Sequence, residues 1–168
     1  MIRNNASFDI SFRTVESRTD LFELLEFAAK HNPGYANYMG WLEKVEDELS
    51  REVKTAILGK YYDRTISDLI FQQSKTDPNA RELKNLRVIP EFSNRYVPRF
   101  MLRQIEGGLG EDFDYMVCDA LASQVGVINF MKSCGYVPVN LIKHPDDNQS
   151  SIVLVKFPRG VNFGDIEE

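Results

Sequence analysis

The order in which strand-like and helix-like segments follow one another constrains this chain more than any other feature. Residues 8–14 alternate apolar and polar side chains, which is typical of a half-buried strand. Two amphipathic helical segments follow, then three further strand-like segments, a helix, a strand, a helix and two final strands. This order, β-α-α-β-β-β-α-β-α-β-β, requires a sheet that contains both hairpin and crossover connections. The sequence therefore predicts one α/β (α+β) domain that spans residues 1–168.

Two helices are expected in the first third of the chain. Asp20 followed by Glu23 is typical of an N-cap and its acidic N3 partner, so the first helix should begin there and end near His31. The second helix is expected to begin near Trp41, with an acidic outer face that includes Glu48. The later strands are expected at 53–60, 65–73, 81–89, 112–119, 136–143 and 151–157, with a turn at 90–98, a helix after it, and another helix at 123–134.

The charge balance narrows the choice of partners. Lys and Arg together number 20 and Asp and Glu number 25, so the net charge is −5. Broad, non-specific binding of nucleic acid depends on neutralising phosphates with basic side chains. Nucleic acid therefore remains a possible partner but is not favoured.

Cysteine and histidine usage narrows the chemistry. Cys118 and Cys134 form neither a disulfide framework nor a zinc ribbon, and two histidines are too few for a histidine-rich metal site. No segment approaches the roughly 20 apolar residues of a membrane span. We therefore expect a cytoplasmic protein without a metal site or membrane contact, with flexible ends at residues 1–7 and 160–168.

Two local segments are informative in combination with the order of elements. Residues 86–92 read Leu-Arg-Val-Ile-Pro-Glu-Phe and precede a loop and a helix that contains residues 99–103. Residues 128–136 form a predicted helix that ends in a Gly-Tyr pair. The order of elements resembles that of the GNAT superfamily of acyl-CoA-dependent N-acyltransferases. The first segment resembles the motif A of that family, and the second resembles its motif B. The resemblance implies a mixed, twisted, mostly antiparallel sheet with helices on both faces.

Motif A implies a pyrophosphate site. The pyrophosphate of coenzyme A is bound where backbone N–H groups converge at a helix N-terminus, and the family loop R/Q-x-x-G-x-G/A uses glycine to let the backbone approach. In this chain Tyr96 and Pro98 fill the two glycine positions, and Pro98 has no N–H. The residues that the resemblance assigns to coenzyme A binding here are Leu86, Arg87, Val88, Ser93, Asn94, Arg95, Tyr96, Val97, Pro98 and Arg99.

Motif B implies further contacts to coenzyme A. By the resemblance, Gln124 and Asn129 are expected to bind it from this helix. Family members often have a Tyr that protonates the departing thiolate, but Met131 fills that position and cannot act as an acid. The general acid is therefore not identified.

The predicted strand before motif A provides the candidate base. Its apolar side chains change phase between Leu83 and Leu86, which is typical of a β-bulge at 84–85. Family members often place a catalytic Glu on this bulged strand. The resemblance therefore assigns the catalytic roles to Glu82 and Asn85, although an exposed carboxylate paired with a neighbouring cation is an equally good interpretation of Glu82.

The connection between the first two helices is the expected acceptor side. Tyr35, Tyr38 and Trp41 lie there and are candidates for substrate binding, or alternatively for anchoring the loop to the core. The resemblance implies transfer of an acetyl group from acetyl-CoA to an amine, by direct attack in a ternary complex, and it is compatible with a homodimer. Two alternatives stay open: a non-catalytic binding or inhibitor protein of this fold, and a transferase with another donor that acts on nucleic acid.

Overall fold

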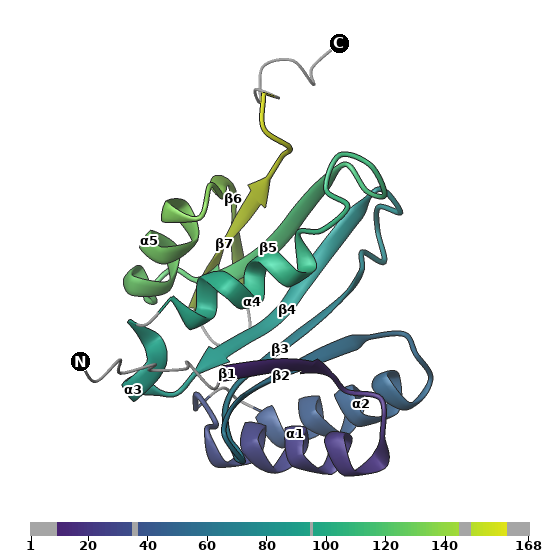
Figure 1. The fold of residues 1–168 in the computed structure, drawn as a ribbon. Helices are drawn as coiled ribbons and strands as arrows, with labels where there is room; N and C mark the ends of the chain where they lie inside the picture. Colours follow the sequence, from purple (N-terminus) through teal and green to yellow (C-terminus); the bar gives the residue numbers. More distant parts are fainter. Residues whose placement is uncertain (1–9, 35–36, 95, 145–148, 161–168) are drawn as a thin grey trace, which may run out of the picture. The chain divides into compact units, whose positions relative to one another are not determined.

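The computed structural model describes residues 10–34, 37–94, 96–144 and 149–160 (Figure 1). The expected flexible ends therefore lie outside the described residues, apart from Gly160. The strands are β1 (Ile10–Thr14), β2 (Thr55–Tyr61), β3 (Arg64–Gln73), β4 (Ala80–Val88), β5 (Tyr115–Leu121), β6 (Val137–His144) and β7 (Gln149–Lys156). The helices are α1 (Arg18–Lys30), α2 (Tyr38–Ser50), α3 (Pro90–Ser93), α4 (Val97–Ile105) and α5 (Val125–Ser133).

The strands form one seven-stranded sheet in the order β1-β2-β3-β4-β5-β7-β6. The pairs β1–β2, β5–β7 and β6–β7 are antiparallel, whereas β4 and β5 are parallel. The parallel pair arises because α3 and α4 form the crossover between β4 and β5. The predicted mixed, mostly antiparallel sheet is confirmed, and so is the predicted order of elements with α3 added.

Contacts divide the chain into two compact units. The first contains Met1–Ile70 and Leu86–Met101, and the second contains Phe71–Asn85 and Leu102–Glu168. In the first unit the apolar faces of α1 and α2 join β2 and β3 in one core. Its fully buried members are Leu24, Val45, Ala56, Leu58 and Ile70.

The start of α1 differs from the expectation. Ser17, not Asp20, is the N-cap: its Oγ accepts the N–H of Asp20 at 3.1 Å, and Asp20 Oδ2 accepts the N–H of Ser17 at 3.2 Å. This reciprocal capping box satisfies two N–H groups that would otherwise be unpaired. The sequence contains two overlapping capping patterns, and the extended backbone at Ser17 selects the earlier one.

The prediction that α2 has an acidic outer face is wrong at one residue, Glu48. Glu48 is only 3% exposed and forms an ion pair with Lys54, which is buried as well. A buried carboxylate must be paired, and Lys54 follows α2 closely enough to reach back to it.

Two element boundaries also differ from the expectation. The helix α2 begins at Tyr38 rather than near Trp41, and the expected turn at 90–98 contains the one-turn helix α3.

Candidate functional site

The connection from β4 to α4 has a backbone shape that favours glycine. After the one turn of α3, Tyr96 adopts a left-handed conformation with φ of 62° and is 73% exposed. Its carbonyl accepts the N–H of Phe100 at 2.9 Å, in the first turn of α4. A left-handed backbone favours glycine over other residues, and in this chain a tyrosine adopts it.

The other expected loop residues surround the start of α4. The first N–H groups of a helix have no partner inside it, and Pro98, in the first turn, removes one of those donors. Val97 is buried, whereas Ser93 and Asn94 are exposed, and Arg99 is half-buried. Arg95 lies outside the described residues. The Ser93 hydroxyl donates to the Pro90 carbonyl at 2.9 Å.

Arg87 and Tyr38 hold the two N-terminal helices to β4. The Arg87 guanidinium donates to the Ala28 carbonyl at 2.9 Å and to the Tyr38 hydroxyl at 2.7 Å. Its Nε also lies 3.9 Å from the carboxylate of the fully buried Asp68. Tyr38 is 5% exposed and stacks on the half-buried Trp41.

These contacts bear on two expected site residues. Tyr38 is buried and its hydroxyl and ring are both engaged by this chain, as the alternative role of anchoring the loop to the core predicts. The Arg87 side chain forms an internal tie, and the binding roles of both residues stay predictions. Leu86 and Val88, its neighbours on β4, are half-buried, and Tyr35 lies outside the described residues.

Glu82 lies where the ladder between β4 and β5 ends. The described residues of the pair are in register only from Ala80↔Tyr115 to Glu82↔Val117. The Glu82 carboxylate accepts hydrogen bonds from Gln72 Nε2 and from Lys84 Nζ, both at 2.8 Å. Asn85 follows on the same strand and is half-buried. The bulge and the catalytic roles of Glu82 and Asn85 stay predictions.

The residues expected from motif B lie at and on α5. Gln124 is the N-cap of α5, although its side chain makes no capping hydrogen bond, and Asn129 is exposed on the helix. Met131 is buried. Tyr136 after the helix is buried too, and burial raises the pKa of its phenol, so it is a poor acid in this structure.

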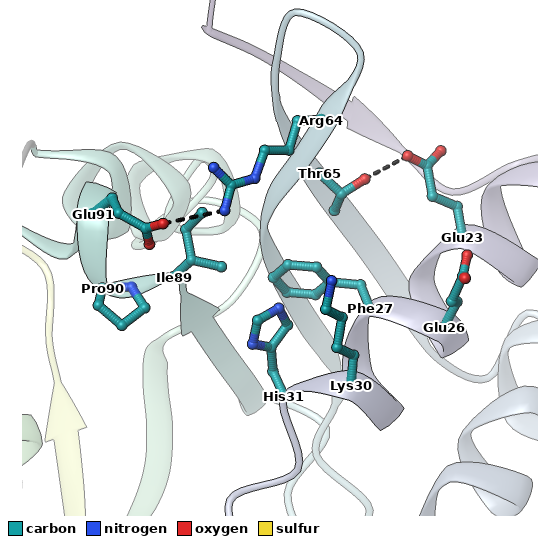
Figure 2. Close-up of a pocket in the computed structure, with 10 residues that line it drawn as sticks. All are labelled: Glu23, Glu26, Phe27, Lys30, His31, Arg64, Thr65, Ile89, Pro90 and Glu91. Carbon is teal, nitrogen blue, oxygen red and sulfur yellow. Dashed lines mark hydrogen bonds and ion pairs between the residues drawn. The ribbon is translucent and has the colours of Figure 1, made fainter.

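A pocket of about 370 Å³ lies within the first unit, and the sequence analysis did not find it. Figure 2 shows side chains from α1 on one side of it and side chains from the start of β3 and from α3 on the other. Three distant segments form it, so no single motif could have revealed it. Its lining consists of Glu23, Glu26, Phe27, Lys30, His31, Arg64, Thr65, Ile89, Pro90 and Glu91.

Most of the acidic groups in this pocket are already neutralised. Glu23 pairs with Lys60 at 2.5 Å and with Arg13 at 2.6 Å. Burial raises the pKa of Glu23, but the hydrogen bonds from Lys60 and Thr65 outweigh it and the pKa is lower than usual. Glu91 pairs with Arg64 at 3.2 Å (Figure 2).

His31 is the titratable group at the apolar side of the pocket. Its ring lies 4.6 Å from the ring of Phe27, centroid to centroid. Burial lowers the pKa of His31, and the positive charges of Arg87, Lys30 and Arg64 lower it further. The imidazole is therefore neutral at pH 7.

Comparison with solved structures shows that the fold is that of the GNAT acetyltransferases. A protein from Desulfovibrio desulfuricans described as a GNAT-family acetyltransferase matches with a TM-score of 0.72 and 11% identity, over 88% of this chain and 98% of its own. A GNAT acetyltransferase from Elizabethkingia anophelis with acetyl-CoA bound matches with a TM-score of 0.66 and 17% identity, over 89% and 99%.

A third solved structure has a named acceptor. The ribosomal-protein-S18-alanine N-acetyltransferase of Escherichia coli matches with a TM-score of 0.65 and 14% identity, over 92% of this chain and 99% of its own. At such identities the likeness shows the fold alone. No protein-family profile and no curated protein sequence matches this chain.

Among the described residues, no group of three or more His, Cys, Asp or Glu side chains is placed to hold a metal ion. No helix in the described part of the chain has the length and apolar character needed to span a membrane.

Proposed function

We propose that this protein is an N-acyltransferase that moves an acetyl group from acetyl-CoA to an amine by direct attack in a ternary complex. The left-handed backbone at Tyr96, directly before α4, is the observation that supports it most strongly. Glycine adopts that conformation most readily, and the resemblance places glycine at this position of the loop. The acetyl-CoA bound to the Elizabethkingia anophelis protein supports the same donor here.

The donor would be held by backbone and by one arginine. The N–H groups at the start of α4 and the Arg99 guanidinium would bind the pyrophosphate, aided by the positive end of the helix dipole. Backbone groups of Leu86 and Val88 would contact the pantetheine arm. Arg87 is left out because its side chain is engaged elsewhere.

Glu82 would serve as the base. The amine nitrogen forms a bond to the thioester carbonyl carbon, the carbon–sulfur bond breaks, and the sulfur leaves with its electron pair. Glu82 accepts the proton that the amine loses. Gln72 and Lys84 hold the carboxylate in place through their hydrogen bonds at 2.8 Å.

A thermal-shift titration with acetyl-CoA tests the donor site. Ligand at about 100 times its Kd adds about 2.7 kcal/mol to the stability of the folded state. For a chain of this length, that stabilisation raises Tm by roughly 5–11 °C. Adenosine monophosphate, which lacks the pantetheine arm and the thioester, is the control ligand and should give a much smaller shift.

Replacement of one arginine locates the site. We expect Arg99→Ala to reduce the acetyl-CoA shift, because Arg99 is in the first turn of α4, where the pyrophosphate would bind. Arg103→Ala is the matched control, since Arg103 is in the last turn of the same helix and is exposed. The absence of a shift with the unmodified chain at millimolar acetyl-CoA would refute the proposal and favour the non-catalytic alternative.

A further inference from the structure

The strand β4 places a lysine amine directly on the proposed base. Lys84 Nζ donates a hydrogen bond to Glu82 Oε1 at 2.8 Å, and the Lys84 side chain is 27% exposed. We infer that Lys84 is itself an acceptor, so that the chain transfers an acetyl group from acetyl-CoA to its own lysine. This self-acetylation rests on the proposed N-acyltransferase function, and it gives that function a defined modification site.

The geometry of β3 and β4 fixes the carboxylate against the amine. Successive side chains of a strand point to opposite faces, so residues 82 and 84 lie on the same face of β4. The other oxygen of Glu82 accepts a hydrogen bond from Nε2 of Gln72, which is buried on β3. An amine in hydrogen-bond contact with a carboxylate held in this way meets the geometric requirement for general base catalysis.

The position of Lys84 along β4 suits the reach of the donor. In the proposed donor site the pyrophosphate is bound at the start of α4, and the pantetheine arm contacts Leu86 and Val88. The thioester is at the far end of that arm, so it would extend along β4 towards lower residue numbers. Lys84 is two residues before Leu86 on the same strand. Its amine and the proposed base would therefore both lie where the thioester arrives, and such proximity accelerates a transfer strongly.

The transfer balances with acetyl-CoA as its only co-reactant. The Lys84 ammonium gives a proton to the Glu82 carboxylate, and the freed amine attacks the thioester carbonyl carbon. A carbon–nitrogen bond forms, the carbon–sulfur bond breaks, and the sulfur leaves with its electron pair. The nitrogen loses a second proton as the amide forms. One of the two protons ends on the coenzyme A sulfur and the other is released to water, so each chain is modified once.

Mass spectrometry of the full chain after incubation with acetyl-CoA tests the inference. We expect the intact mass to increase by one acetyl group, peptide mapping to place that group on Lys84, and an equal amount of coenzyme A thiol to be released. An acetyl group that maps only to other lysines would overturn the inference.

Two other lysines of the chain are internal controls. Lys44 is exposed, so it reports spontaneous acetylation of an accessible amine. Lys156 contacts the Glu106 carboxylate at 2.7 Å and its side chain is 20% exposed, so it reports the effect of a neighbouring carboxylate alone. We expect Lys84 to react about a hundredfold faster than either, which is within the usual range for general base catalysis. Equal rates at Lys84 and Lys156 would refute the inference.

Two substitutions assign the roles of base and acceptor. Glu82→Gln keeps the size of the side chain but removes the base, so it should slow acetylation of Lys84 by about a hundredfold. Lys84→Arg keeps a cation beside Glu82 and should abolish both the modification and the release of thiol. Lys156→Arg is the matched control and should change neither. Undiminished acetylation of Lys84 in the Glu82→Gln variant would contradict the assignment of the base and with it the inference.

The acetyl-CoA titration separates this inference from the function on which it rests. All three variants should keep the acetyl-CoA shift, because none of these side chains is proposed to contact the donor. A chain that shows the shift but carries no acetyl group on Lys84 would refute self-acetylation and leave the transferase in place. A chain without the shift would refute the transferase, and self-acetylation would fall with it.

Discussion

At the scale of single residues, Tyr96 has the most unusual backbone in the candidate donor loop. A left-handed conformation costs a non-glycine residue about 1 kcal/mol or more, and the side chain, 73% exposed, recovers little of this by packing. We expect Tyr96→Gly to raise the free energy of unfolding by about 0.5–1 kcal/mol and to strengthen acetyl-CoA binding. Urea unfolding and the thermal-shift titration measure the two effects.

Tyr62 provides the matched control for that substitution. It is also left-handed, with φ of 51°, and 62% exposed, but it lies in the hairpin between β2 and β3 and its ring packs edge-on against Tyr61. Tyr62→Gly should therefore bring a smaller gain in stability and no change in acetyl-CoA binding. A clear loss of acetyl-CoA binding in Tyr96→Gly would show that the tyrosine ring itself contacts the donor.

His31 gives the stability of the protein a pH dependence. Its pKa is lower in the folded state than the ordinary value of 6.5, so the unfolded chain binds the proton more tightly. The stability contribution is fully present above pH 6.5 and is lost as the pH falls towards the lowered pKa. We expect Tm to fall over this range, and to fall less in His31→Gln. Identical pH profiles for the two proteins, measured by calorimetry, would contradict this.

At the scale of elements, the capping box sets where α1 begins. Ser17 and Asp20 exchange hydrogen bonds, and the Ser17 hydroxyl lowers the pKa of Asp20 most strongly. We expect Ser17→Ala to cost about 1 kcal/mol in urea unfolding. Ser50→Ala, at the last residue of α2, should lower the free energy of unfolding much less, since Ser50 is exposed and does not cap a helix. Equal losses in both variants would argue against the cap.

Elements with a long periodic pattern were predictable, and shorter features were not. Residues 81–89 were expected as a strand and form β4 from Ala80 to Val88, because several apolar positions support the pattern. The four residues of α3 are too few to show a helical period. Glu48 has the polarity of a surface residue, and only its ion pair with Lys54 explains its burial.

At the scale of the whole molecule, the net charge bears on the alternative that the protein is a transferase acting on nucleic acid. A chain with a net charge of −5 lacks the excess of cations that drives binding to phosphate backbones. We expect bulk transfer RNA to bind weakly even at low salt, with little further change at high salt. Fluorescence anisotropy with labelled transfer RNA measures this. Tight binding that weakens steeply with salt would favour a nucleic-acid-dependent transferase instead.

The amino-acid sequence by itself determined the order of elements, the mixed sheet and the likeness to the GNAT fold. These features depend on local periodicity and on turn residues, and both involve residues that are close together in the chain. Only the tertiary structure decided what the candidate side chains contact. The Arg87 guanidinium donates a hydrogen bond to the Tyr38 hydroxyl, and both side chains donate to the carbonyl of Ala28, although both residues were expected at ligand sites. The pocket likewise required folding, since α1, β3 and α3 meet there from positions far apart in the chain.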